Sequence, residues 1–110
     1  MGRMKIPQIT VQELNKKIKN NDDFILIDVR EIEEYEFCKI DNSYLIPLGV
    51  FEKEIPRLKK EKPYILMCKS GGRSTEAVKI MIQNGFVDVK NLTGGISQWA
   101  IDIDSSIAIY

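Results

Sequence analysis

The stretch Cys68-Lys69-Ser70-Gly71-Gly72-Arg73-Ser74 joins two segments of opposite character. Before it, Tyr64 to Met67 is a short apolar run after Pro63, which predicts a buried β-strand. After it, range 75–84 places apolar residues at helical spacing, and Gly85 stands where a helix cap is expected. The pattern therefore predicts a strand, a loop containing two glycines and a helix in direct succession.

A cysteine at this place is suited to nucleophilic chemistry with anions. Gly71 and Gly72 lack a Cβ atom, so the backbone can curl with several amides pointing inward. The following helix adds unpaired N–H groups and the positive end of its dipole. With the charges of Lys69 and Arg73, these groups are expected to lower the pKa of Cys68 from about 8.5. Arg73 could also hold an oxyanion. The alternative is a structural cysteine beside an ordinary turn.

Further motifs occur along the chain in a defined order. They are Ile27-Asp28-Val29-Arg30-Glu31, Glu34-Tyr35, Ile46-Pro47-Leu48, Gly85-Phe86, and Asn91-Leu92-Thr93-Gly94-Gly95-Ile96 followed by Trp99. With the loop, they resemble the rhodanese (sulfurtransferase) domain over about residues 8–101. The resemblance implies one rhodanese-like domain over residues 1–110, with residues 102–110 as a tail outside the match. It also implies an α/β fold with a largely parallel sheet of about five strands and helices on both faces.

The same resemblance implies a sulfurtransferase that needs no cofactor. Cys68 would carry sulfur as a persulfide, and the anion-binding loop would comprise Lys69, Ser70, Gly71, Gly72, Arg73 and Ser74. The donor would be thiosulfate or a protein persulfide such as that of a cysteine desulfurase. The acceptor would be a thiol, cyanide or a sulfur-carrier protein.

Two other functions fit parts of this pattern. Phosphatases related to the rhodanese fold also use a cysteine loop that ends in arginine, but their loops are longer. Here four residues separate Cys68 from Arg73, and the smaller ring suits one sulfur atom better than a tetrahedral phosphate. A non-catalytic rhodanese-like module would usually lack the cysteine. Sulfur transfer is therefore the favoured prediction.

Composition restricts the other classes of function. The 110 residues have balanced charge, with 16 basic and 16 acidic side chains, so a nucleic-acid partner has little support. The chain has no histidine and no CxxC motif, which argues against a metal site and requires activation of Cys68 by dipoles and cations. Neither a signal sequence nor a membrane-spanning run is evident. The two cysteines do not suggest a disulfide framework, which favours a reducing, cytoplasmic setting.

The first half of the chain reads as helix, strand and helix. Thr10-Val11-Gln12-Glu13 is a capping box for a helix whose inner face would carry Val11, Leu14 and Ile18. The range 24–27 is apolar throughout, as in a strand buried on both faces of a parallel sheet. Asp28 and Arg30 follow this strand, and we expect them to form a buried pair that supports the loop rather than to contact substrate. A short helix is expected over residues 31–37.

The rest of the sequence predicts two more strands, at residues 43–47 and 87–92. Pro56 interrupts a possible helix over residues 51–58. Trp99 is expected to pack a short helix into the core.

Cys38 is interpreted as a small buried residue, with a resolving thiol for Cys68 as the alternative. Leu48-Gly49, Glu34-Tyr35-Glu36 and the tail resemble rhodanese domains fused to E1-like adenylating enzymes, which suggests a separate adenylating partner as a minor hypothesis.

Overall fold

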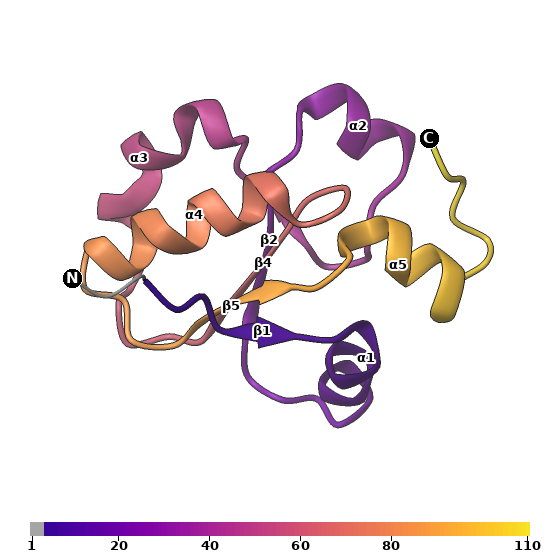
Figure 1. The fold of residues 1–110 in the computed structure, drawn as a ribbon, viewed down its shortest axis with the longest axis horizontal. Helices are drawn as coiled ribbons and strands as arrows, with labels where there is room; N and C mark the ends of the chain where they lie inside the picture. Colours follow the sequence, from indigo (N-terminus) through magenta and orange to yellow (C-terminus); the bar gives the residue numbers. More distant parts are fainter. Residues whose placement is uncertain (1–3) are drawn as a thin grey trace.

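Residues 4–110, which the computed structural model describes, contain one five-stranded sheet in the order β1-β5-β4-β2-β3 (Figure 1). Every adjacent pair of strands is parallel. The strands are β1 (Gln8–Ile9), β2 (Ile25–Asp28), β3 (Tyr44–Leu45), β4 (Tyr64–Met67) and β5 (Val89–Leu92). The predicted parallel α/β architecture is therefore confirmed.

Helices cover both faces of this sheet. They are α1 (Val11–Lys19), α2 (Ile32–Phe37), α3 (Phe51–Glu54), α4 (Gly72–Gln83) and α5 (Gly95–Asp102). In Figure 1, α3 and α4 lie on one side of the strands, and α1 and α5 lie on the other. The segment after α5 runs back toward α2.

The two faces of the sheet support two separate hydrophobic clusters. Successive residues of a strand point to opposite faces, so Leu66 packs in the cluster that contains α3 and α4 residues, whereas Ile65 packs in the cluster that contains α1 and α5 residues. The neighbouring strand behaves in the same way, with Ile27 in the first cluster and Leu26 in the second. This two-sided burial explains why both strands are apolar without alternation.

The capping box at the start of α1 is present as predicted. The Thr10 hydroxyl accepts a hydrogen bond from the Glu13 amide at 3.1 Å, and the Glu13 carboxylate accepts one from the Thr10 amide at 2.9 Å. Val11 and Leu14 are buried, but Ile18 is 38% exposed. The prediction of Ile18 as an inner-face residue was therefore wrong, because it lies one turn beyond Leu14 on the rim of a surface cavity.

The structure defines two helix boundaries that the sequence left open. The helix after the loop begins at Gly72, ahead of the apolar periodic range 75–84, so Arg73 and Ser74 lie in its first turn. The segment around Pro56 consists of the four-residue α3 followed by a 3₁₀ turn over Ile55–Arg57. Proline at the second position of this turn removes an amide donor that a continuing α-helix would need.

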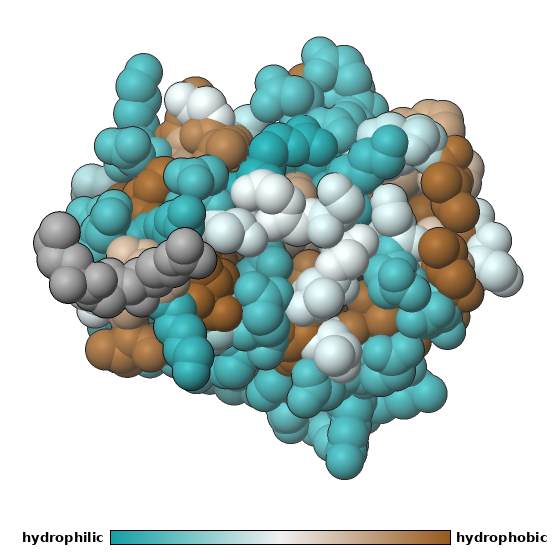
Figure 2. Space-filling model, in the orientation of Figure 1, coloured by the Kyte–Doolittle hydropathy of each residue, from teal (hydrophilic) through white to brown (hydrophobic). Residues whose placement is uncertain are grey.

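The surface is largely hydrophilic on the face seen in Figure 2, although apolar side chains collect along its right-hand edge, over α5 and the segment that follows it. Ile101 and Ile109, from these parts of the chain, are 65% and 63% exposed. Within residues 4–110, none of the helices combines the length and the apolar character needed to cross a lipid bilayer.

Candidate active site

The loop from Cys68 to Gly71 lies where the parallel strands end. Cys68 directly follows β4, and its neighbours in the sheet, β2 and β5, end at the same edge. This edge is where open α/β sheets gather functional groups. The first turn of α5 is hydrogen-bonded to the loop. The Ile96 amide donates to the Cys68 carbonyl, and the Ser97 amide donates to the Lys69 carbonyl, both at 3.0 Å.

Close packing between this loop and α5 depends on Gly95. Gly95 has φ +56°, and a Cβ atom there would overlap the carbonyl oxygens of Cys68 and Lys69. The absence of a side chain therefore lets the backbone of α5 approach the residue that carries the thiol.

The Cys68 sulfur lies inside the loop, among hydrogen-bond donors. The residue is only 1% exposed, and its Sγ accepts a hydrogen bond from the Gly71 amide at 3.0 Å. The Ser74 hydroxyl oxygen is 3.3 Å from the same sulfur. Burial raises the pKa of the thiol, but hydrogen bonds from the Ser74 side chain and from the amides of Ser74, Gly71 and Ser70 lower it by more. The expected downward shift thus arises without any histidine.

The two loop glycines have different roles. Gly71 has φ +120°, a conformation that L-residues rarely adopt, and it directly precedes α4. Gly72 is the first residue of α4, has no positive φ, and has open space where a Cβ would lie. The sequence analysis assigned the curl of the loop to both glycines, whereas the backbone requires glycine only at Gly71.

Arg73 does not point a free guanidinium at the loop. Its Nη1 and Nη2 donate to the two carboxylate oxygens of Glu34 on α2, at 2.6 and 3.0 Å. This pair lowers the pKa of Glu34 to about 2 and raises that of Arg73. The expectation that Arg73 is free to hold an oxyanion therefore needs correction, because its planar fork is already paired with a carboxylate.

The other loop cation packs against the chain's last residue. The Lys69 ammonium lies 4.5 Å from the centroid of the Tyr110 ring, a cation–π distance. The Tyr110 hydroxyl donates to Glu34 at 2.7 Å and accepts from Arg30 at 2.9 Å. Ser70 is exposed at the rim of the loop. Tyr110 therefore connects three charged side chains around the loop.

Asp28 and Arg30 form the predicted buried pair. Both are 0% exposed, and Arg30 Nη2 donates to Asp28 Oδ2 at 2.7 Å. The Arg30 guanidinium also donates to the carbonyls of Glu34 and Cys38, at 3.3 and 2.6 Å. It thus links the end of β2 to the last turn of α2.

Cys38 and Cys68 are both free thiols and belong to different parts of the core. Cys38 is half-buried, packs against the cluster that contains α1 and α5 residues, and lies 3.8 Å from Arg30 Nη1. Cys68 belongs to the cluster on the α3 and α4 side. This separation by the sheet gives the interpretation of Cys38 as a resolving thiol no structural support.

Glu34, Asn91 and Tyr110 reach the site without having been predicted there. Glu34 and Asn91 belong to motifs quoted for the family resemblance, but the sequence analysis gave neither a role in the site. Asn91 is 4% exposed and contacts the Ser74 side chain. Tyr110 had no local signal, because its contact with Glu34 spans 76 residues.

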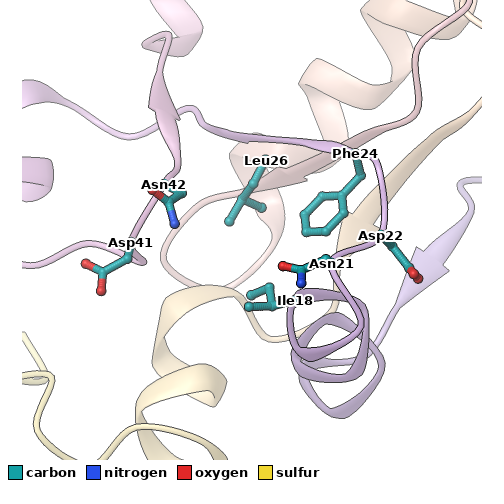
Figure 3. A pocket seen from close by; sticks show the side chains of 7 residues that line it. All are labelled: Ile18, Asn21, Asp22, Phe24, Leu26, Asp41 and Asn42. Atoms are coloured by element: carbon teal, nitrogen blue, oxygen red, sulfur yellow. The ribbon is translucent and has the colours of Figure 1, made fainter.

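A cavity of about 240 Å³ lies elsewhere, between the end of α1 and the turn at residues 41–42 (Figure 3). Its lining residues are Ile18, Asn21, Asp22, Phe24, Leu26, Asp41 and Asn42, and none comes from the loop. Among residues 4–110, no group of three or more His, Cys, Asp or Glu side chains is arranged to hold a metal ion. The chemistry of the thiol, rather than the size of a cavity, identifies the candidate site.

Known proteins resemble this chain over most of its length. The family model described as "Rhodanese-like domain" matches residues 10–102. YtwF of Bacillus subtilis, which carries the name of a candidate sulfurtransferase, is 35% identical over 87% of this chain and 92% of its own. A crystal structure of a rhodanese-like domain protein from Staphylococcus aureus has a TM-score of 0.82 and 30% identity, covering 96% of this chain and 99% of that one.

Longer proteins match as well. The adenylyltransferase and sulfurtransferase UBA4 of Debaryomyces hansenii is 36% identical over 94% of this chain, but the match covers 25% of UBA4. The chain spans about half the length, or less, of several other curated relatives.

Proposed function

Because the chain belongs to the rhodanese-like domain family, we propose that it transfers sulfur through a persulfide on Cys68. Sulfur transfer in general is supported by the family and by relatives named as sulfurtransferases. The observation that carries the persulfide assignment is the position of the Cys68 sulfur, which accepts a hydrogen bond from the Gly71 amide directly before α4.

In the proposed reaction, the Cys68 thiolate attacks the outer sulfur of thiosulfate or of a protein persulfide. The sulfur–sulfur bond of the donor breaks, and sulfite or the donor thiolate leaves with the bonding electrons. The new terminal sulfur is an anion, which the inward-pointing amides and the nearby Lys69 charge would stabilise. A thiol, cyanide or carrier protein then attacks that sulfur, and the Cys68 thiolate leaves. The two steps balance without an external oxidant or reductant.

Further assignments complete the proposal. The domain comprises residues 1–110, and the protein works in the cytoplasm, where free thiols persist. Its physiological donor is a cysteine desulfurase or another persulfide protein, and its acceptor is a sulfur-carrier protein. Asp28 and Arg30 support the loop rather than contacting the donor, which fits their complete burial and mutual pairing.

Phosphate transfer is less compatible with this geometry. A phosphatase of this type needs its loop arginine to bind phosphate oxygens, and both terminal nitrogens of Arg73 are engaged by Glu34. Aryl phosphates should therefore be hydrolysed at the background rate.

Intact mass spectrometry tests the proposal directly. The protein is incubated with thiosulfate, and separately with a cysteine desulfurase and cysteine. We expect a gain of one sulfur atom that a reductant reverses. Cys68→Ser should abolish this gain, while Cys38→Ser should retain it. A gain that survives Cys68→Ser and disappears in Cys38→Ser would overturn the assignment. Absence of any gain would instead favour a non-catalytic module.

A further inference from the structure

The Ser74 hydroxyl lies between the Cys68 sulfur and the side chain of Asn91. Its oxygen is 3.3 Å from Cys68 Sγ and 2.5 Å from Asn91 Oδ1. Ser74 and Asn91 are 0% and 4% exposed, so water does not compete freely for these groups. A hydroxyl has a single proton to donate, and here two acceptors are within reach of it.

Neighbouring groups determine which way the Asn91 amide faces. The Gln8 Nε2 group donates to the Ile6 carbonyl at 3.4 Å, so Gln8 Oε1 faces the opposite way. Gln8 Oε1 then accepts from Asn91 Nδ2 at 3.0 Å and from the Thr93 hydroxyl at 2.8 Å. A flipped Asn91 would bring its carbonyl oxygen against Gln8 Oε1, where neither atom can donate. The Asn91 carbonyl therefore faces Ser74.

While Cys68 is protonated, this orientation commits the Ser74 proton to Asn91. A carbonyl oxygen can only accept, so the hydroxyl must donate to it and present a lone pair to Cys68. That arrangement suits the protonated thiol, whose S–H can donate to Ser74. When the thiolate forms, the hydroxyl can stabilise it only by rotating, which leaves the buried Asn91 carbonyl without this donor.

We propose that Asn91 is a positioning residue that competes with the Cys68 sulfur for the single Ser74 proton. Asn91 thereby makes thiolate formation less favourable than the loop amides and a freely donating Ser74 hydroxyl would together allow. The same competition affects Cys68 each time it leaves as a thiolate. The importance of this effect for turnover rests on the proposed function of Cys68, but the competition itself does not.

The charged groups near the loop are unaffected by a neutral change at Asn91. They are Lys69 in the loop, Arg73 on α4, Glu34 on α2, and the Asp28–Arg30 pair after β2. The hydrogen bonds of Ser74 and Asn91 described above go instead to neutral side chains and to the cysteine. A substitution at Asn91 therefore alters hydrogen bonding while leaving the charges in place.

The test measures the alkylation rate of Cys68 against pH, in a Cys38→Ser background so that one thiol reacts. Asn91→Leu removes the competing carbonyl at similar size, so Ser74 can donate to the thiolate. We expect the midpoint to fall by about half to one pH unit, or roughly three- to tenfold more thiolate below the midpoint. In a Ser74→Ala background, the same substitution should cause no shift. Thr93→Val, which changes a neighbour of Gln8 only, is the matched control.

A second variant covers the case in which Asn91→Leu does not fold, as judged by circular dichroism. Gln8→Leu alters an exposed side chain on the edge strand and removes the acceptor that orients Asn91. The amide can then flip and donate to Ser74, which again lowers the midpoint and again requires Ser74. An unchanged midpoint in the folded variants, or an equal shift with and without Ser74, would overturn the proposal. Because no sulfur donor is used, a failure of persulfide formation would leave this result interpretable.

Discussion

The Glu34 carboxylate accepts four hydrogen bonds. Oε1 accepts from the Arg73 guanidinium and the Glu31 amide, and Oε2 accepts from Arg73 and the Tyr110 hydroxyl. The hydrogen bond with Arg73 is the largest cause of its pKa of about 2. Glu34 on α2 therefore binds both Arg73, in the first turn of α4, and Tyr110.

Glu34 should make the fold sensitive to acid. Its pKa is depressed from an unfolded value of about 4.3, so its stabilisation is fully present above that pH and is lost as pH falls toward 2. We expect Glu34→Gln to reduce the free energy of unfolding at pH 7 by about 1–2 kcal/mol, less than the full shift implies because Arg73 is 37% exposed. Urea denaturation at pH 7 and pH 3 measures both effects.

Glu33→Gln on the exposed side of the same helix is the control, and it should change neither value by much. If Glu34→Gln unfolded with the same pH dependence as the native protein, the ion pair would not be a stabilising contact in solution.

Individual site residues were predictable where the signal was local. Cys68 was identified because it leaves a strand and enters a glycine-containing loop, and Asp28 and Arg30 because they follow an apolar strand. The partners of Glu34 could not be read in this way. Arg73 lies 39 residues away from it and Tyr110 lies 76 residues away, so only the folded chain brings these groups together.

At the level of elements, the junction between β4 and α4 is held by one unusual backbone conformation. Gly71 adopts φ +120° and ψ −9°, which turns its amide toward the Cys68 sulfur. Gly72, its neighbour, already has the conformation of a helix start. Adjacent and identical residues therefore have different tolerances to substitution.

We expect Gly71→Ala to lower the free energy of unfolding by about 1–3 kcal/mol, because L-residues are strained at this φ. It should also raise the alkylation midpoint of Cys68 by displacing an amide donor. Gly72→Ala should be neutral or slightly stabilising, since alanine favours the helix and has space there. Chemical denaturation and alkylation of both variants provide the comparison. Equal destabilisation by the two substitutions would contradict this account of the loop.

The first residue of α4 could not be located from hydrophobic periodicity, for a related reason. Its first residues, Gly72, Arg73 and Ser74, carry no apolar periodicity, and α4 has no side-chain cap. The Thr75 hydroxyl donates back to the Gly71 carbonyl at 2.7 Å. The strands were predicted more accurately, because burial on both faces requires continuous apolar runs in β2 and β4.

Across the whole molecule, Arg30 connects several separate parts of the chain. It contacts Asp28 at the end of β2, the carbonyls of Glu34 and Cys38 on either side of α2's last turn, and the Tyr110 hydroxyl. Its complete burial lowers its pKa, but the hydrogen bonds that it donates to its partners raise the pKa by more. The guanidinium therefore stays charged inside the fold.

Arg30→Ala should leave the Asp28 carboxylate buried without its partner. We expect the free energy of unfolding to fall by about 3–5 kcal/mol, because removing one member of a buried ion pair leaves an uncompensated charge. Thermal and urea denaturation measure the loss. Arg57→Ala breaks an ion pair in which the arginine side chain is 79% exposed, and should cost less than about 1 kcal/mol. Comparable losses in the two variants would argue against a special role for the buried pair.

The overall architecture was largely predictable, except for one edge strand. The central strands are recognisable from their apolar sequences, and β3 lies within the strand predicted over residues 43–47. The two-residue β1 was not predicted, because so short a strand carries too little pattern to be distinguished from a loop. The family resemblance, rather than local periodicity, supplied the expectation of about five strands.

The pairing of β1 with β5 also determines how early the sheet can be completed during synthesis. Gln8 lies 83 residues before its partner Asn91, which at about 5–20 residues per second separates their synthesis by roughly 4–17 s. Until β5 is made, β1 has no strand to pair with, and α5 is not yet present to hold the Cys68 carbonyl. The nascent chain thus carries its thiol before the groups that enclose it exist. Cys68 should acquire its reactivity only after α5 has been synthesised.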